Sequence, residues 1–258
     1  MTTPLAERQA DCRGGLQSVL AALDLLDCFA EREEFGVSEL ARNIGVAKST
    51  AHRLLTTLCA RGYAERDEES GRYRLGLHLY ELGHLAVSRS DIRNAALPLL
   101  QEIHQRTGAT VHLGVPDGDE VVYLERIVGR DSLSTWSGVG RRLPSLTTSS
   151  GKAMYAYSPR FANGRLQGPL PNAFSTDSLM VGRYRVALQE TVKRGFAMSV
   201  DEQIKGLTSI ASPVVGHSGT ARAAISIVGP TKKMLADLSN PARLVQLASK
   251  KLSRELCL

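Results

Sequence analysis

The spacing of apolar residues at the start of the chain predicts three helices. A stripe at helical spacing covers residues 16–29, and its members are Leu16, Val19, Leu20, Leu23, Leu26 and Phe29. Two shorter amphipathic segments follow, over residues 38–44 and 47–61. Gly45 between them can adopt the positive φ of a sharp turn, and Ser38 is the expected N-cap of the first segment. This order of short helices around a tight turn predicts a helix-turn-helix.

The helix predicted over residues 47–61 has one apolar and one polar face. The residues expected to face inward are Ala51, Leu54, Leu55 and Leu58. The residues expected to face outward are Lys48, Ser49, Thr50, His52, Arg53, Thr56 and Thr57. Such hydroxyls, imidazole and cations can bond phosphates and base edges in a DNA groove, and Arg42 before the turn adds another cation. The alternative is an ordinary helical hairpin with a solvated polar face.

Two extended segments after these helices predict a wing. They cover residues 64–66 and 72–75 and are joined by a polar turn, which is typical of a β-hairpin. Arg72 and Arg74 are two residues apart, so they share one side of the hairpin, where they could meet phosphate. Residues 15–76 are therefore predicted to form an all-α winged helix-turn-helix domain that binds DNA.

The charge distribution supports DNA binding only locally. The net charge is +6, but residues 1–90 carry 11 Lys and Arg against 13 Asp and Glu, a net of −2. Residues 91–258 carry 21 against 13, a net of +8, for which the sequence offers no explanation. Within residues 37–63 four basic residues stand against Glu39 alone, and such a cluster attracts phosphate.

Length and composition predict a soluble protein with two modest domains. The chain has 258 residues, of which 43% are hydrophobic and 22% charged. Since no apolar run approaches the ~20 residues of a membrane span and no secretory core precedes the first helix, we expect a cytoplasmic protein. The cysteines are far apart, which predicts reduced thiols and no metal site; they are Cys12, Cys28, Cys59 and Cys257.

The pattern after residue 76 predicts a linker helix within residues 77–90 and then an α+β domain over residues 91–258. Helices are expected over residues 91–106 with Asp91 as cap, over residues 149–157 and 184–194, and from Asn240 as N-cap with Pro241 at the first helical position. Strands are expected over residues 110–115, 120–128, 132–136, 196–200, 207–215 and 221–228, and a mobile loop over residues 158–172.

Several segments, in order along the chain, resemble one known family. They are QSVLAALDLL, SELARNIGVAKSTAHRLLTTLCARGY and SGRYRLG in the first half, and GRRLPSLTTSSGKAMYAY, VKRGFAMSVDEQIKGLTSIASPV and AAISIVGP in the second. Together they resemble the IclR family of bacterial transcriptional regulators over nearly all of the chain beyond residue 15. The resemblance implies a GAF-like effector-binding domain, a homodimer or homotetramer, a double-stranded DNA operator and, by family habit, repression. It implies no cofactor.

The resemblance also implies an effector site in the second domain. Carried over position by position, its residues are Ser149, Ser150, Ser199, Ser209, Ser226 and Val228, and Trp136 could supply an apolar wall. Ser226 and Val228 are two residues apart on a predicted strand, so they share one sheet face. The alternative is that these serines only contact solvent or backbone.

Two of these positions depart from the pattern of the family. Members that bind small acids often have an acidic residue in place of Ser199 and Cys in place of Ser209. The predicted pocket therefore has hydroxyls and no charge of its own, and hydroxyls bond donors as well as acceptors. We expect a small polar ligand, such as an aromatic acid, amide or hydrazide.

Two other classes of protein compete with this prediction. Ser149 and Lys152 have the Ser-x-x-Lys spacing of an acyl-transfer site, which would suit a hydrolase with an accessory DNA-binding domain. Neither Ser149 nor Ser209, however, has a convincing histidine or acid partner in the sequence. A DNA-packaging protein would bind without sequence preference, and the net negative first half disfavours it. We expect no enzymatic activity, no catalytic residue and no metal.

Overall fold

The computed structural model describes residues 15–129, 138–167 and 178–256, and the chain divides into two compact units between Arg89 and Ser90. The first unit contains α2 (Gln17–Cys28), α3 (Val37–Asn43), α4 (Lys48–Ala60), β1 (Ala64–Arg66), β2 (Tyr73–Leu75) and α5 (Leu77–Ser88). The second contains α6 (Asp91–Thr107), β3 (Thr110–Asp117), β4 (Glu120–Ile127), β5 (Arg142–Pro144), α7 (Ser149–Tyr155), β6 (Phe161–Ala162), β7 (Arg165–Leu166), α8 (Ser178–Arg194), β8 (Ala197–Val200), β9 (Leu207–Val215), β10 (Ala221–Pro230), α9 (Thr231–Ala236) and α10 (Ser239–Glu255).

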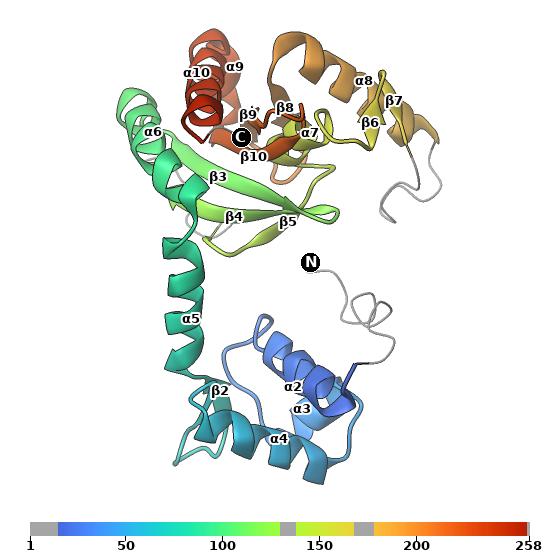
Figure 1. Ribbon diagram of the computed structural model, residues 1–258, viewed down its shortest axis with the longest axis vertical. Helices are drawn as coiled ribbons and strands as arrows, with labels where there is room; N and C mark the ends of the chain where they lie inside the picture. Colours follow the sequence, from blue (N-terminus) through green and yellow to red (C-terminus); the bar gives the residue numbers. More distant parts are fainter. Residues whose placement is uncertain (1–14, 130–137, 168–177, 257–258) are drawn as a thin grey trace. The chain divides into compact units, whose positions relative to one another are not determined.

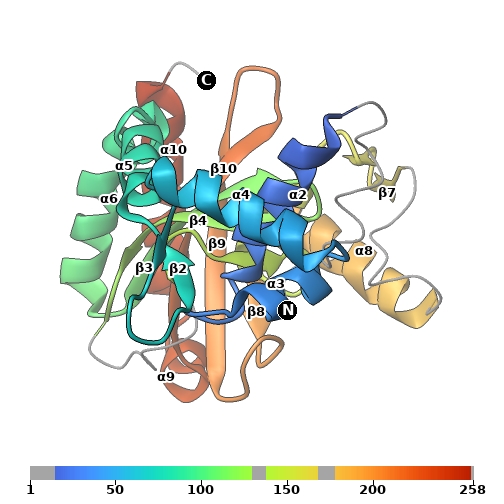
Figure 2. The ribbon, with the colours of Figure 1, turned by 90° about the horizontal axis from the view of Figure 1, so that it is seen from below.

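Three helices and a hairpin enclose the core of the first unit. Helices α3 and α4 lie next to each other (Figure 2), and α2 contacts both. The core is centred on Leu25, Leu40 and Leu55, which have no exposed surface. Strands β1 and β2 are antiparallel, with Ala64 opposite Leu75. The predicted winged helix-turn-helix fold is confirmed.

The buried face of α2 differs from the predicted stripe. Ala21, Leu25 and Cys28 are buried, whereas Leu16 is 74% and Leu23 is 54% exposed; of the predicted stripe, Phe29 alone is buried. The helix carries two apolar rows at helical spacing, and α3 and α4 cover the row that includes the small Ala21. Periodicity identifies apolar rows but does not say which one a neighbouring helix covers.

The cap of α3 also differs from the prediction. Gly36 occupies the N-cap, and its N–H donates to the Glu39 carboxylate at 2.7 Å. Ser38 therefore lies inside the first turn. A carboxylate three residues into a helix can satisfy an amide at its start, so this helix begins without an N-cap hydroxyl.

Two caps in the second unit fall close to their predicted positions but not on them. Ser90 is the N-cap of α6, and Asp91 lies in the first turn, where the helix dipole favours a carboxylate. Helix α10 begins at Ser239, ahead of the predicted Asn240. The amide of Asn240 donates to the Asp237 carboxylate at 3.3 Å, so an upstream side chain supplies the acceptor.

The second unit is built on one antiparallel sheet, in the order β5-β4-β3-β10-β9-β8. Helices α6 and α10 cover one face (Figure 1), over a core that includes Leu100, Ile225 and Leu252. Helix α7 packs on the other face through Ala153 and Met154. An antiparallel sheet with helices on both faces confirms the predicted α+β class.

Some segments of this unit differ from the prediction. The strand predicted over residues 132–136 lies outside the described residues, and β5 forms the edge of the sheet next to β4. The segment predicted as a loop contains the β6–β7 hairpin, whose turn uses Asn163 and Gly164 at positive φ. Two-residue strands are too short to show a period of two. Helix α8 begins six residues before the predicted start, because Gly182 interrupts the pattern that predicts it.

Candidate DNA-binding and effector sites

The polar face predicted for α4 is exposed. Ala51 and Leu55 point into the unit and have no exposed surface, which turns the opposite face outward. The exposed residues are Lys48, Ser49, Thr50, His52, Arg53, Thr56 and Thr57. The hydroxyls of Thr56 and Thr57 donate to carbonyls one turn earlier, at 2.9 and 3.0 Å, so each hydroxyl oxygen can still accept a bond. The predicted face is confirmed, and its contacts with DNA remain a prediction.

A glycine in the left-handed region sets the turn before α4. Gly45 has a φ of 70°, and the N–H of Val46 donates to the carbonyl of Ala41 at 3.0 Å. This bond closes the last turn of α3 in the manner of a Schellman motif. Since the left-handed region strains any residue with a Cβ, the turn explains the glycine that the sequence places there.

Two cations on α4 are available for phosphate. Lys48 and Arg53 are exposed, and neither has an acidic partner in the part of the chain that the structure describes. Arg42, also exposed, donates from Nε to the carbonyl of Ser38 at 3.3 Å, which leaves its terminal nitrogens for other acceptors. Lys48 and Arg53 are therefore the strongest candidates for phosphate contacts.

The arginines of the wing are already paired. Arg72 lies just before β2 and donates to the carboxylate of Glu39 at 3.1 Å and to the carbonyl of Glu34 at 3.2 Å. Arg74 donates to Glu65 across the hairpin at 3.1 Å. Each guanidinium still has N–H groups that these bonds do not use, so it can also bind phosphate. Acidic neighbours partly neutralise the charge of the wing arginines, whereas Lys48 has no such neighbour among the described residues.

The residues predicted for an effector site share one face of the large sheet. Ser199, Ser209 and Val228 lie opposite one another on β8, β9 and β10, and Ser226 lies two residues from Val228. The partner of Ser226 on β9 packs against α7, so this face is the one that α7 covers. Buried at the start of α7 are Ser149 and Ser150. Trp136 lies outside the described residues.

Hydrogen bonds hold the start of α7 against the sheet. The Ser199 hydroxyl donates to the carbonyl of Thr147 at 2.7 Å, and the Thr148 hydroxyl caps the helix by accepting from the N–H of Gly151 at 3.1 Å. The backbone passes so close to Ser145 that a Cβ on Gly151 would lie 2.1 Å from the Ser145 carbonyl oxygen. Only glycine allows this approach. The start of α7 therefore has a fixed position over the sheet.

Lys152 has a structural partner that the sequence did not reveal. Its Nζ is buried and lies 2.5 and 2.6 Å from the two carboxylate oxygens of Glu202, with the Met198 carbonyl at 3.4 Å. A lysine that acts as a general base must hold a free amine beside its nucleophile. Here the ammonium is bound by a carboxylate from another segment, which removes the basis for the Ser149–Lys152 hydrolase.

Two buried residues near the predicted site were missed. His112 of β3 lies opposite Ser226, and its ring centre is 5.0 Å from that of Tyr123 on β4. Burial, together with the charge of Arg126, lowers the pKa of His112 to about 3. Burial raises the pKa of Tyr123 to about 12, against a lowering effect of the Ser150 hydroxyl. The sequence did contain one signal for this part of the site, namely a histidine among the apolar residues of β3.

Arg126 changes the expected charge of this region. It lies opposite His112 on β4 and is partly buried. The sequence predicted a pocket without charge, whereas this guanidinium places a positive charge next to His112. No group of three or more His, Cys, Asp or Glu side chains that could hold a metal occurs among the described residues. Within the same residues, no helix is long and apolar enough to cross a membrane.

Family models match both units. The model described as the bacterial transcriptional regulator IclR C-terminal domain matches residues 84–254, and the IclR helix-turn-helix domain matches residues 18–68. The HTH-type transcriptional regulator XynR of Escherichia coli (strain K12) is 38% identical over 246 residues, which cover 93% of this chain and 97% of that protein. The regulator KdgR of the same strain is 30% identical over 244 residues, 93% of each chain.

Solved structures show the same fold. An IclR transcriptional regulator from Alicyclobacillus acidocaldarius matches with a TM-score of 0.77 and 26% identity, over 93% of this chain and 98% of the other. An IclR homologue from Microbacterium hydrocarbonoxydans, complexed with 4-hydroxybenzoate, matches with a TM-score of 0.76 and 26% identity, over 93% and 99%. With a helix-turn-helix that binds DNA and a C-terminal domain that binds an effector, the chain belongs to the IclR family of bacterial transcriptional regulators.

Proposed function

We propose that this regulator is a cytoplasmic, non-enzymatic repressor that binds a promoter operator through α4 and senses a small polar metabolite in its second unit. The exposed face of α4 carries the proposal, because a row of hydroxyls and two cations lie on the helix that follows the turn, and neither cation pairs with an acidic residue among those described. Repression, as opposed to activation, is what the resemblance to the family implies. Deleting the gene should raise expression from the target promoter, measured with a reporter fusion, and reintroducing it should lower expression again.

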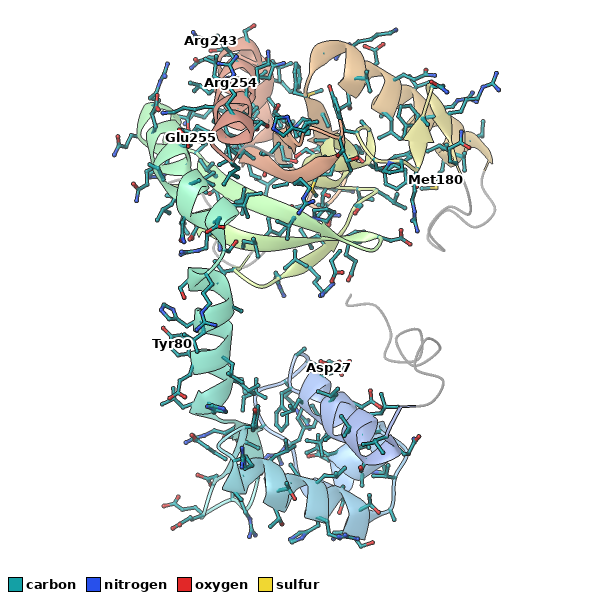
Figure 3. All side chains as sticks on the ribbon, in the orientation of Figure 1. Asp27, Tyr80, Met180, Arg243, Arg254 and Glu255 are labelled. Carbon is teal, nitrogen blue, oxygen red and sulfur yellow. The ribbon has the colours of Figure 1, made fainter. Side chains whose placement is uncertain are left out.

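A second copy of the chain suits the linker helix. Helix α5 has no buried residue, and Tyr80 projects from it (Figure 3). Its exposed large apolar residues are Leu77, Tyr80, Leu82 and Leu85, with exposed fractions of 65%, 69%, 41% and 45%. Large apolar side chains left exposed on one helix favour an interaction site. A homodimer, alone or paired into a homotetramer, would cover it and present two α4 helices to two half-sites.

An aromatic acid or a related amide or hydrazide suits the second unit as effector. The homologue from Microbacterium hydrocarbonoxydans, complexed with 4-hydroxybenzoate, supports this class. The proposed contacts are the serines on the α7 side of the sheet, with Val228 at the end of β10 and Trp136 as an apolar wall. Hydroxyls can bond both the acceptors and the donors of such a ligand.

Linkage between the two sites would supply the switch. A ligand that prefers one arrangement of the paired DNA-binding units changes DNA affinity by the same free energy by which DNA changes ligand affinity. A coupling of about 1–3 kcal/mol is enough for regulation.

Two substitutions test whether the sites are separate. Arg53→Ala should weaken operator binding and leave ligand binding intact, because the side chain lies on the exposed face of α4. Ser209→Leu should weaken ligand binding and leave operator binding intact, because it fills the sheet face beside Ser199. Loss of both activities in both variants would overturn the two-site proposal.

A further inference from the structure

Four uncharged polar side chains meet beneath α7. His112 and Tyr123 have ring centres 5.0 Å apart on adjacent strands, with an interplanar angle of 54°. Ser226 lies opposite His112 on β10, and Ser150 comes from the first turn of α7. Each of the four is at most 5% exposed. They form what we call the buried polar group.

One hydroxyl of this group lacks a hydrogen-bond partner. Ser150 has no exposed surface, and its Oγ is close enough to Tyr123 to lower the pKa of the phenol. The phenol of Tyr123 is near that Oγ, but no described residue makes a well-formed hydrogen bond with it. Buried polar groups in folded proteins are nearly always bonded, so this hydroxyl has hydrogen-bonding capacity left for a partner from outside the chain. The hydroxyl lies on the same sheet face as Ser226.

The chemistry of the buried polar group favours an uncharged partner. The directions of the pKa shifts keep His112 and Tyr123 neutral at physiological pH. A neutral imidazole offers one donor and one acceptor, and each hydroxyl offers both. An ionised carboxylate among such groups would lose its hydration without a counter-charge, whereas a hydroxyl or carboxamide would keep its hydrogen bonds. A negatively charged end of the same ligand would be stabilised near Arg126. Arg126 lies opposite His112 on β4, on the side away from Ser226.

We propose that His112 and Tyr123, together with Ser150 and Ser226, bind an uncharged hydroxyl or carboxamide group of the effector and so determine its specificity. The inference rests on the proposed function, because it places the effector on the α7 face of the sheet. His112 and Tyr123 are specificity-determining residues that act through hydrogen bonds. A ligand with an uncharged polar substituent at one end and an acid at the other matches this arrangement.

Calorimetric titration of the full-length protein with 4-hydroxybenzoate and with benzoate tests the assignment. The wild type should bind 4-hydroxybenzoate at least about tenfold more tightly, which corresponds to one hydrogen bond. Tyr123→Phe removes only the phenol oxygen and should abolish most of this preference while the affinity for benzoate stays the same. His112→Leu should have the same effect. Tyr157→Phe, at a half-buried tyrosine just beyond α7, should preserve the preference.

Three outcomes would overturn the assignment. One is an unchanged preference in Tyr123→Phe, and another is an equal loss of affinity for both ligands, which would indicate a structural role. The third is a wild type that binds benzoate or a small aliphatic acid in preference to the phenol. In each case, if the bound acid still changed operator binding, the proposed function as a ligand-responsive regulator would stand and only the assignment of these residues would fail. Operator binding that responds to no compound would instead remove the sensing function.

Discussion

The buried ammonium of Lys152 and the carboxylate of Glu202 form an ion pair, with Nζ–O distances of 2.5 and 2.6 Å, that joins α7 to the loop between β8 and β9. The same loop supplies Gln203, which donates to the hydroxyl of Thr147 just before the helix. Ser199 bonds the carbonyl of Thr147 from the end of β8. The helix start that carries the proposed effector serines is therefore held by residues 199–203.

Removing the carboxylate of this pair should destabilise the second unit. Glu202→Gln leaves the Lys152 ammonium buried without a counter-charge. The cost should stay below the about 3–5 kcal/mol typical of a fully buried pair, because the Glu202 side chain is 37% exposed. Denaturant unfolding measures the change. Lys193→Met breaks an exposed pair with Glu190 and should change stability by less than about 0.5 kcal/mol. Equal effects of the two variants would contradict this account.

A methyl group at Gly151 should not fit. Its Cβ would lie 2.1 Å from the Ser145 carbonyl oxygen and 2.2 Å from the Ser145 Cα, and backbone atoms cannot move aside at low cost. Gly151→Ala should destabilise the second unit by about 1–3 kcal/mol or more and weaken effector binding. Gly182→Ala is the matched control in α8, where a Cβ meets nothing within 4 Å. It should stabilise the protein by about 0.5–1 kcal/mol. A stable Gly151→Ala variant would refute the close approach.

The cations of α4 should determine the salt dependence of DNA binding. Arg53→Ala or Lys48→Ala should weaken operator binding roughly tenfold and reduce the slope of log affinity against log salt by about one. Fluorescence anisotropy at several salt concentrations gives both values. Arg222→Ala removes an exposed charge from the second unit and should leave the slope unchanged. If Arg222→Ala lowered the slope as much as Arg53→Ala, binding would not depend on α4 in particular.

The carboxylate at the start of α3 should make the first unit sensitive to acid. The N–H of Gly36, then Arg32 and Arg72, lower the pKa of Glu39 from its ordinary value of 4.5 to about 2. Because the folded pKa is depressed, its stabilising contribution is present above about pH 4.5 and is lost as the pH falls toward 2.

Thermal unfolding across this pH range tests the Glu39 prediction. Glu39→Gln should lower the melting temperature at neutral pH and flatten its decline between about pH 4.5 and 2. Glu68→Gln, at an exposed carboxylate in the hairpin turn, should leave both unchanged. A Glu39→Gln variant with the decline of the wild type would show that other groups cause the acid sensitivity.

Local patterns predicted the DNA-binding unit well, because its features depend on neighbours in sequence. Gly45, the apolar face of α4 and the polar hairpin turn are all short-range features. The prediction of the buried face of α2 was wrong, because contacts with α3 and α4 determine which of its two apolar rows is buried. The N-cap of α3 was predicted wrongly as Ser38, because the Glu39 carboxylate bonds the N–H of Gly36 and the helix needs no hydroxyl at its start.

The candidate effector site was predicted in part. Ser226 and Val228 share one sheet face, as their spacing indicates, and Ser199 and Ser209 lie on the same face of neighbouring strands. His112 and Tyr123 were missed, since their proximity depends on the pairing of β3 with β4 and β10. The partner of Lys152 was missed for the same reason, because Glu202 lies 50 residues away in sequence.

The most direct test of the account is binding of the purified protein to the DNA upstream of its own gene. Unrelated DNA of equal length serves as the control, at two salt concentrations, with and without 4-hydroxybenzoate. The account predicts a preference of about 10³ or more for the upstream DNA that survives the higher salt. Equal affinity for both DNAs, lost at the higher salt in either ligand condition, would contradict site-specific regulation by α4.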